Sequence, residues 1–245
     1  MKNASLIIAQ KELRVFFDSL VAYILLIAFL GFSGFFTWFY GSDVFLTKQA
    51  NLQSFFQIAY WTLFFFIPAL TMRSLAEENK SGTIELLLTK PVSNWQLLWG
   101  KFLACILLIL IALVLTLPYY ITILNLGQTG KVDSGTIFCG YIGLLLMSAT
   151  YISIGIFASS ITSNQVVAFL VALFIGIFFH FIFGLLGTSL PGTTGELINY
   201  LSMSSHFDGI SRGLIDSRDL VYFGGIIFLG LVMAEVSLAK RSISE

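Results

Sequence analysis

Five long stretches without a single charged side chain constrain this sequence most. They cover residues 19–42, 49–72, 102–130, 134–195 and 220–234. A helix needs about 20 consecutive apolar residues to cross the hydrocarbon core of a bilayer. Each of the first three stretches therefore accommodates one membrane-spanning helix, and the sequence predicts an integral membrane protein.

The fourth stretch is too long for one span. Its 62 residues would form a helix of about 93 Å, three times the thickness of a bilayer core. The polar run Ser159–Gln165 predicts a turn that divides it. The fifth stretch is short and is followed by Glu235, yet it still favours a span. The sequence thus predicts an all-α protein with six transmembrane helices, at residues 20–40, 54–74, 98–124, 136–159, 165–186 and 220–239.

Composition excludes most soluble functions. Only 11% of the residues are charged and 57% are hydrophobic, whereas a soluble domain has about 25% charged residues. The formal net charge is zero, so no basic surface for nucleic acid is expected.

The distribution of Lys and Arg predicts the orientation of the chain in the membrane. If the N-terminus is cytoplasmic, the inner segments hold nine Lys and Arg and the outer segments hold four. Both termini are therefore predicted on the cytoplasmic side.

The first 18 residues precede the first span and have their own amphipathic pattern. Leu6, Leu13, Phe16 and Phe17 share one helical face, while charged residues lie largely on another. This pattern favours a helix that lies in the membrane interface. A simple extension of the first span is the alternative.

No metal or disulfide site is predicted. Cys105 and Cys139 both fall in or next to spans, where small buried side chains are expected. The two histidines are far apart, with His180 in an apolar span and His206 in an expected loop. An intramembrane histidine suggests function, but without a carboxylate near it in sequence, a neutral packed role for His180 is at least as good an interpretation.

The connection between the second and third spans, residues 75–97, is charged and sharply bounded. A short helix is expected after Gly82, and Pro91 should end it because the residue before proline leaves the helical region. Ser93 and Gln96 form a capping box for the next helix. This projection is interpreted either as an amphipathic surface helix or as a docking element for a soluble partner.

The string from Glu77 to Ser93, EENKSGTIELLLTKPVS, resembles the cytoplasmic loop of type-2 ABC transporter membrane subunits. The six spans and the N-terminal interfacial helix fit the same family. Within it, the sequence resembles the gliding-motility-associated permeases of the GldF type. That likeness rests on five segments: IPALTMR at 67–73, GTIELLLTKP at 82–91, SIGIF at 153–157, NQVVAF at 164–169 and SSHFDGISRGLIDSRD at 204–219.

The resemblance implies a non-catalytic permease subunit in a bacterial cytoplasmic membrane, forming one transmembrane domain over residues 1–245. It implies no cofactor in this chain, with ATP and Mg²⁺ held by a GldA-like ABC ATPase partner. A second permease copy or a GldG-like membrane subunit would complete the assembly. In the family, the loop after the second span is a coupling helix that docks on the ATPase. Carried over, the docking residues are Glu77, Glu78, Gly82, Thr83, Glu85, Leu88 and Pro91.

Residues 188–219 form a long extracytoplasmic segment between the fifth and sixth spans. The resemblance implies short re-entrant helices here. Asp208, Arg212 and Asp216 alternate in charge at four-residue spacing, which predicts an amphipathic helix over about 203–215. A solvated loop is the alternative.

Two other functions fit an apolar chain of this kind. A self-contained secondary transporter usually carries intramembrane ionisable residues, and only His180 and Glu235 meet that condition here. An intramembrane hydrolase would need a nucleophile paired with a base, and the sequence offers no such pair. The sequence indicates no substrate and no transport direction.

Overall fold

The computed structural model describes residues 4–39, 51–82, 92–126 and 132–243. Over these ranges the regular structure is helical and includes no strand. Six helical segments are long and apolar enough to cross a membrane. The predicted all-α, six-span architecture is therefore confirmed. The segments are Leu20–Trp38, Gln53–Ser81, Asn94–Leu126, Ser134–Ser160, Gln165–Ser189 and Ser217–Lys240.

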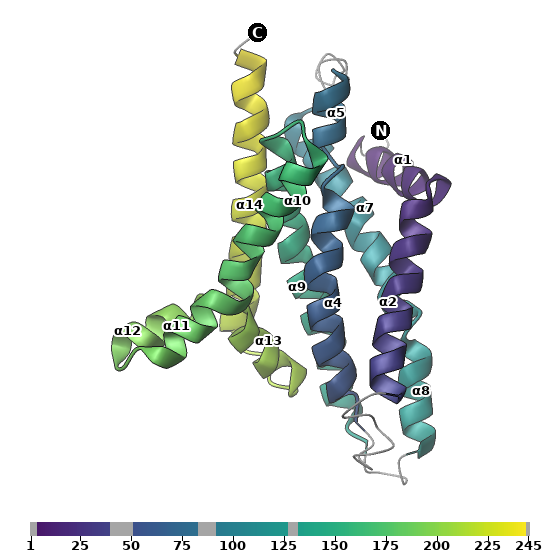
Figure 1. Cartoon of the computed structure of the whole chain (residues 1–245), viewed down its shortest axis with the longest axis vertical. Helices are drawn as coiled ribbons and strands as arrows, with labels where there is room; N and C mark the ends of the chain where they lie inside the picture. Colours follow the sequence, from purple (N-terminus) through teal and green to yellow (C-terminus); the bar gives the residue numbers. More distant parts are fainter. Residues whose placement is uncertain (1–3, 40–50, 83–91, 127–131, 244–245) are drawn as a thin grey trace.

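Several spans consist of more than one helix. The helices of the six spans are α2 (Leu20–Trp38), α4 (Gln53–Thr71) with α5 (Ala76–Ser81), α7 (Asn94–Val114) with α8 (Leu117–Leu126), α9 (Ser134–Ser160), α10 (Gln165–Ile177) with α11 (Phe183–Ser189), and α14 (Ser217–Ile243). Among the described residues, three further helices lie outside the spans: α1 (Ala4–Asp18), α12 (Thr193–Asn199) and α13 (Met203–Ser211). Figure 1 shows that α1, α5 and the end of α14 lie at one end of the bundle, which we call the terminal end.

Helix α9 is the centre of the bundle. It packs against α4, α7, α10, α13 and α14, and it is the most buried of the six spans. Small residues permit these contacts, because a Cβ at Gly155 would overlap the Thr71 side chain of α4 and one at Gly140 would overlap Phe56. Close approach through small residues is the usual way in which membrane helices pack.

Helix α1 lies across the terminal end of the bundle rather than along it (Figure 1). Leu13, Phe16 and Phe17 pack against the core, whereas Leu6 is 58% exposed. The four residues predicted to share one apolar face therefore do not share one environment. Three of them fix α1 to the bundle, and Leu6 lies on its uncovered side.

Two spans are interrupted at positions that the sequence analysis did not predict. The third span breaks after Val114, where Pro118 lacks the N–H that would bond to that residue's carbonyl. In the fifth span, residues Phe178–Ile182 form a π-helix between α10 and α11. Its His180 is buried and stacks on Tyr60, with ring centroids 4.0 Å apart. His180 also has a partner from another span, because its Nδ1 lies 2.6 Å from the Tyr151 hydroxyl.

The helix predicted over about 203–215 ends earlier, at Ser211. Gly213 has a φ of 91°, a left-handed conformation that terminates the helix. Asp208 lies in α13 and Arg212 caps its end. Asp216 instead accepts a hydrogen bond from the Arg218 N–H at the start of α14, at 3.0 Å, which lowers the pKa of its carboxyl group. The three charges therefore do not form one helical ladder.

His206 lies in α13, inside the helix predicted over about 203–215 and not in a plain loop. Its Nδ1 is 2.6 Å from Asp219 Oδ1 in α14, and its Nε2 is 2.9 Å from the Tyr200 carbonyl oxygen. The ring also stacks on Tyr222 of α14. One buried imidazole thus connects α13 to α14 at the end of the bundle opposite the terminal end.

Candidate functional site

The site is the junction between α5, α1, α7 and α9 at the terminal end. Of the seven residues predicted to dock on a partner, the structure describes Glu77, Glu78 and Gly82. The other four, Thr83, Glu85, Leu88 and Pro91, lie outside the described residues, as does the helix expected after Gly82. The site is therefore built from the two anchors of this segment, which are α5 before it and the start of α7 after it.

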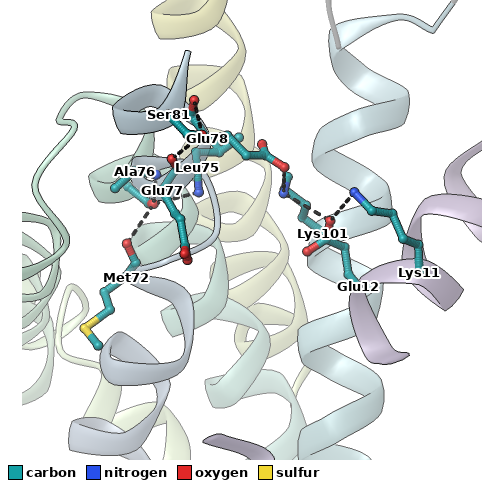
Figure 2. Close-up of polar contacts among 10 residues, drawn as sticks. Lys11, Glu12, Met72, Leu75, Ala76, Glu77, Glu78, Ser81 and Lys101 are labelled. Carbon is teal, nitrogen blue, oxygen red and sulfur yellow. Dashed lines mark hydrogen bonds and ion pairs between the residues drawn. The ribbon is translucent and has the colours of Figure 1, made fainter. Parts of the chain in front are cut away.

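The corner between α4 and α5 is fixed by one serine of α9. The backbone N–H groups of Leu75 and Ala76 both donate to Ser159 Oγ, each at 2.9 Å. The Ser159 hydroxyl donates in turn to the Met72 carbonyl at 3.2 Å. Both N–H groups belong to the start of α5, where a helix leaves its first donors without intrahelical partners. Ser159 thus caps α5 from another span. Figure 2 shows Met72, Leu75 and Ala76 at this corner.

Replacing Ser159 with alanine is expected to destabilise this corner by about 2 kcal/mol, because two buried N–H groups lose their acceptor. Hydrogen exchange of the Leu75 and Ala76 amides measures the effect directly. Ser163→Ala, in the turn that follows α9, is the matched control and should leave both amides protected. Equal protection in the wild type and in Ser159→Ala would contradict this role for Ser159.

A buried lysine joins α5 to two further helices. Lys101 Nζ, in α7, lies 2.8 Å from Glu78 Oε1 of α5 and 3.4 Å from Glu12 Oε1 of α1. Its side chain is only 2% exposed. Figure 2 shows Lys101 between the two carboxylates. The close approach of α1 to α7 has a local cause, since a Cβ at Gly100 would lie 2.6 Å from Ile8 Cγ2.

The two neighbouring carboxylates of α5 have different environments. The Glu77 side chain is exposed, whereas Glu78 points inward to Lys101. Gly82 then ends α5 with a φ of 67°, and its N–H bonds to the Glu78 carbonyl. The left-handed residue after a helix is usually glycine, because glycine has no Cβ to clash. Of the two acidic residues, Glu77 is the one available to a partner molecule.

The start of α7 follows the sequence prediction. The Ser93 side chain accepts from the Gln96 N–H, and the Gln96 side chain accepts from the Ser93 N–H. This capping box is confirmed, and it fixes the point at which the chain re-enters the bundle. The segment 83–91 is therefore held between a capped helix end at Gly82 and a capped helix start at Asn94.

A family model described as an ABC-2 family transporter protein matches residues 6–214. The match covers most of the chain, including five of the six spans and the whole of this site. The chain belongs to the ABC-2 transporter family. No match was found among curated proteins.

Family membership makes this chain a multi-pass permease subunit of an ABC transporter, and it implies an ABC ATPase partner. Permeases of the ABC-2 family are generally non-catalytic. Over the described ranges, no group of three or more His, Cys, Asp or Glu side chains could hold a metal ion. Cys105 and Cys139 are free thiols.

Sequence reasoning missed the residues that hold this ABC-2 permease together at the site. Lys101 falls inside the predicted span 98–124 and is given no role there, and Ser159 appears only as part of a predicted turn. One available signal was the position of Lys101, eight residues after the capping serine and therefore two turns inside the third helix. A charge so placed in a membrane-spanning helix needs a partner, and here it has two.

Proposed function

We propose that this permease transmits ATP-driven movement from a separate ATPase to the membrane through the segment between α5 and α7. The terminal end would face the cytoplasm, because the Lys and Arg count favours that orientation. Residues 83–91 would dock on the ATPase through Thr83, Glu85, Leu88 and Pro91, with Glu77 and Gly82 beside them. The result would be export of a substrate or mechanical work.

One observation carries this proposal: α5 is bound to three other helices by polar contacts. Lys101 connects it to α7 and α1, and Ser159 connects it to α9. Asn79 adds a second contact to the α9–α10 turn, donating to the Thr162 carbonyl at 3.1 Å. A force on the segment would therefore move several packed helices as one body, which is how rigid elements transmit conformational change.

The assembly that we propose is of the gliding-motility type. The supporting residues are those of the resemblance, above all SSHFDGISRGLIDSRD at 204–219. The ATPase would be GldA-like and would hold ATP and Mg²⁺. A GldG-like membrane subunit or a second copy of the permease would complete the transmembrane part in a bacterial cytoplasmic membrane.

The docking proposal is tested with Glu85→Arg combined with Leu88→Asp. Two disrupted interface residues are expected to weaken ATPase binding at least tenfold. The measurement is co-purification of the ATPase with the permease, with ATP hydrolysis by the purified complex as a second readout. The matched control is Glu196→Arg with Leu197→Asp, which makes the same changes at exposed positions near the opposite end.

The control pair should co-purify with as much ATPase as the wild type. If the Glu85/Leu88 pair also did so, with full ATP hydrolysis, the docking proposal would be wrong. Mass spectrometry of the wild-type complex identifies its other subunits. A complex without a GldA-like ATPase or a GldG-like subunit would overturn the assignment to a gliding-motility type while leaving the docking result intact.

A further inference from the structure

One cavity over the described ranges has no lining residue from α1, α5, α7 or α9, the helices of the junction described above. Its volume is about 850 Å³, and it opens between α2, α4, the π-helix, α11 and α13. Binding sites for small molecules usually measure about 300–1,000 Å³. Of these segments, α11 and α13 lie away from the terminal end (Figure 1).

The π-helix at Phe178–Ile182 forms one wall of the cavity. Beyond it, α11 and α12 leave the bundle and extend to one side (Figure 1). A π-helix is rare and is often found at functional sites. The irregular segment of the fifth span is therefore also the segment that creates space beside α4.

Aromatic side chains make up much of the cavity wall. Phe32 and Phe36 come from α2, Trp61 comes from α4 and Phe181 comes from the π-helix. Phe32, Trp61 and Phe181 are each about half exposed. Such rings suit the apolar part of an amphiphile or the face of a sugar ring.

The polar lining consists mainly of uncharged groups. The side chains of Gln57 and Asn199 contribute two carboxamides to the lining. The Ser204 and Ser205 hydroxyls also line the cavity. An amide offers both donors and acceptors, and a hydroxyl does the same. The two serine hydroxyls already bond to Ser202 and to the Asn199 carbonyl, so a ligand with several hydroxyl groups would bond mainly to the two carboxamides.

Charge in the cavity is low. The lining residues include no Lys or Arg within the described parts of the chain, and Asp208 is the one carboxylate. Burial raises the pKa of Asp208, and the nearby Arg212 guanidinium partly offsets this effect. A phosphate head would find no cation here and would be repelled by Asp208. A cationic head would have to compete with Arg212.

His180 adds an unsatisfied polar atom to the same wall. The Tyr151 hydroxyl lies 2.6 Å from His180 Nδ1, and in one of the two ring tautomers the hydroxyl donates to that nitrogen. The remaining ring hydrogen is then on Nε2, which is buried and has no partner among the described residues. Buried donors without an acceptor are uncommon and need an explanation. The Nε2 atom has almost no accessible surface and its ring packs among Tyr60, Trp61 and Phe64, so a molecule in the cavity does not reach it in this conformation.

We propose that this cavity binds an amphiphile with an uncharged, hydroxyl-bearing head, as in an uncharged glycolipid. Aromatic residues would hold the apolar part and the Gln57 and Asn199 amides would bind the hydroxyl groups. As an assignment of the substrate class, this inference rests on the proposed transport function. As a binding site, it is testable without the ATPase.

The test uses the full chain in phosphatidylcholine nanodiscs with Trp38, Trp95 and Trp99 replaced by phenylalanine, so that only Trp61 in the cavity emits. Two lipids with identical dibrominated acyl chains are added separately, a monogalactosyl diacylglycerol and a phosphatidylglycerol. Bromine quenches tryptophan only at close range. The galactolipid should reach half-maximal quenching at a mole fraction about fivefold lower than phosphatidylglycerol does. A fivefold difference in affinity corresponds to about one hydrogen bond.

Gln57→Leu should remove this preference, and Gln53→Leu one turn earlier in α4 should keep it, because Gln53 is outside the cavity lining. Equal quenching by both lipids, a preference for phosphatidylglycerol, or an unchanged preference in Gln57→Leu would overturn the proposal. Because no ATPase is present, none of these outcomes depends on the docking of residues 83–91.

Discussion

Replacing Lys101 with methionine is expected to lower the free energy of unfolding by about 3–5 kcal/mol, because Glu12 and Glu78 would lose their shared partner in a largely buried place. Thermal unfolding of the purified chain measures the loss. The matched control is Lys11→Met. Lys11 is 62% exposed and 3.8 Å from Glu12, so its removal should cost less than about 1 kcal/mol.

A rescue variant separates unpaired charge from lost packing. Lys101→Met combined with Glu12→Gln and Glu78→Gln removes all three charges, and replacing a buried ionic group by neutral side chains is often tolerated. Most of the stability should therefore return. ATP-driven activity should remain low in the rescued protein, because α5 would no longer be tied to α1 and α7. If Lys101→Met were as stable as Lys11→Met, the ion cluster would have no structural role.

The six-span fold could be predicted from the sequence because a bilayer allows few alternatives. Backbone groups in hydrocarbon must bond within the segment, so long charge-free stretches become helices. The capping residues Ser93 and Asn164 likewise act locally, and both helix starts lie where the polar residues indicated. The Ser159–Gln165 turn is also confirmed, with α9 ending at Ser160.

The internal contacts of the site could not be predicted, because they depend on packing between distant segments. Glu77 and Glu78 are adjacent and chemically alike, and only the position of Lys101 on another helix distinguishes them. Lys101 in turn reaches Glu12 because Gly100 lets α1 approach α7. The π-helix around His180 has no sequence signal comparable to a proline or a cap.

A leucine in place of Gly155 is expected to cost at least about 3 kcal/mol. Even a Cβ at this position would overlap the Thr71 side chain of α4, and overpacking of a dense core is destabilising. Gly225 provides the matched control, because a Cβ there meets nothing within 4 Å and the position is exposed in α14. Gly225→Leu should be neutral or slightly stabilising, since leucine favours a helix more than glycine does.

Gly155→Leu should also weaken the hydrogen bonds that hold the corner between α4 and α5. Ser159 follows Gly155 by one helical turn, so both residues face α4 from the same side of α9. A leucine that pushes the two helices apart would carry Ser159 Oγ away from the Leu75 and Ala76 N–H groups. Hydrogen exchange of these two amides should therefore accelerate in Gly155→Leu and stay slow in Gly225→Leu. Equal exchange rates in the two variants would show that the α4–α9 contact does not control the geometry of α5.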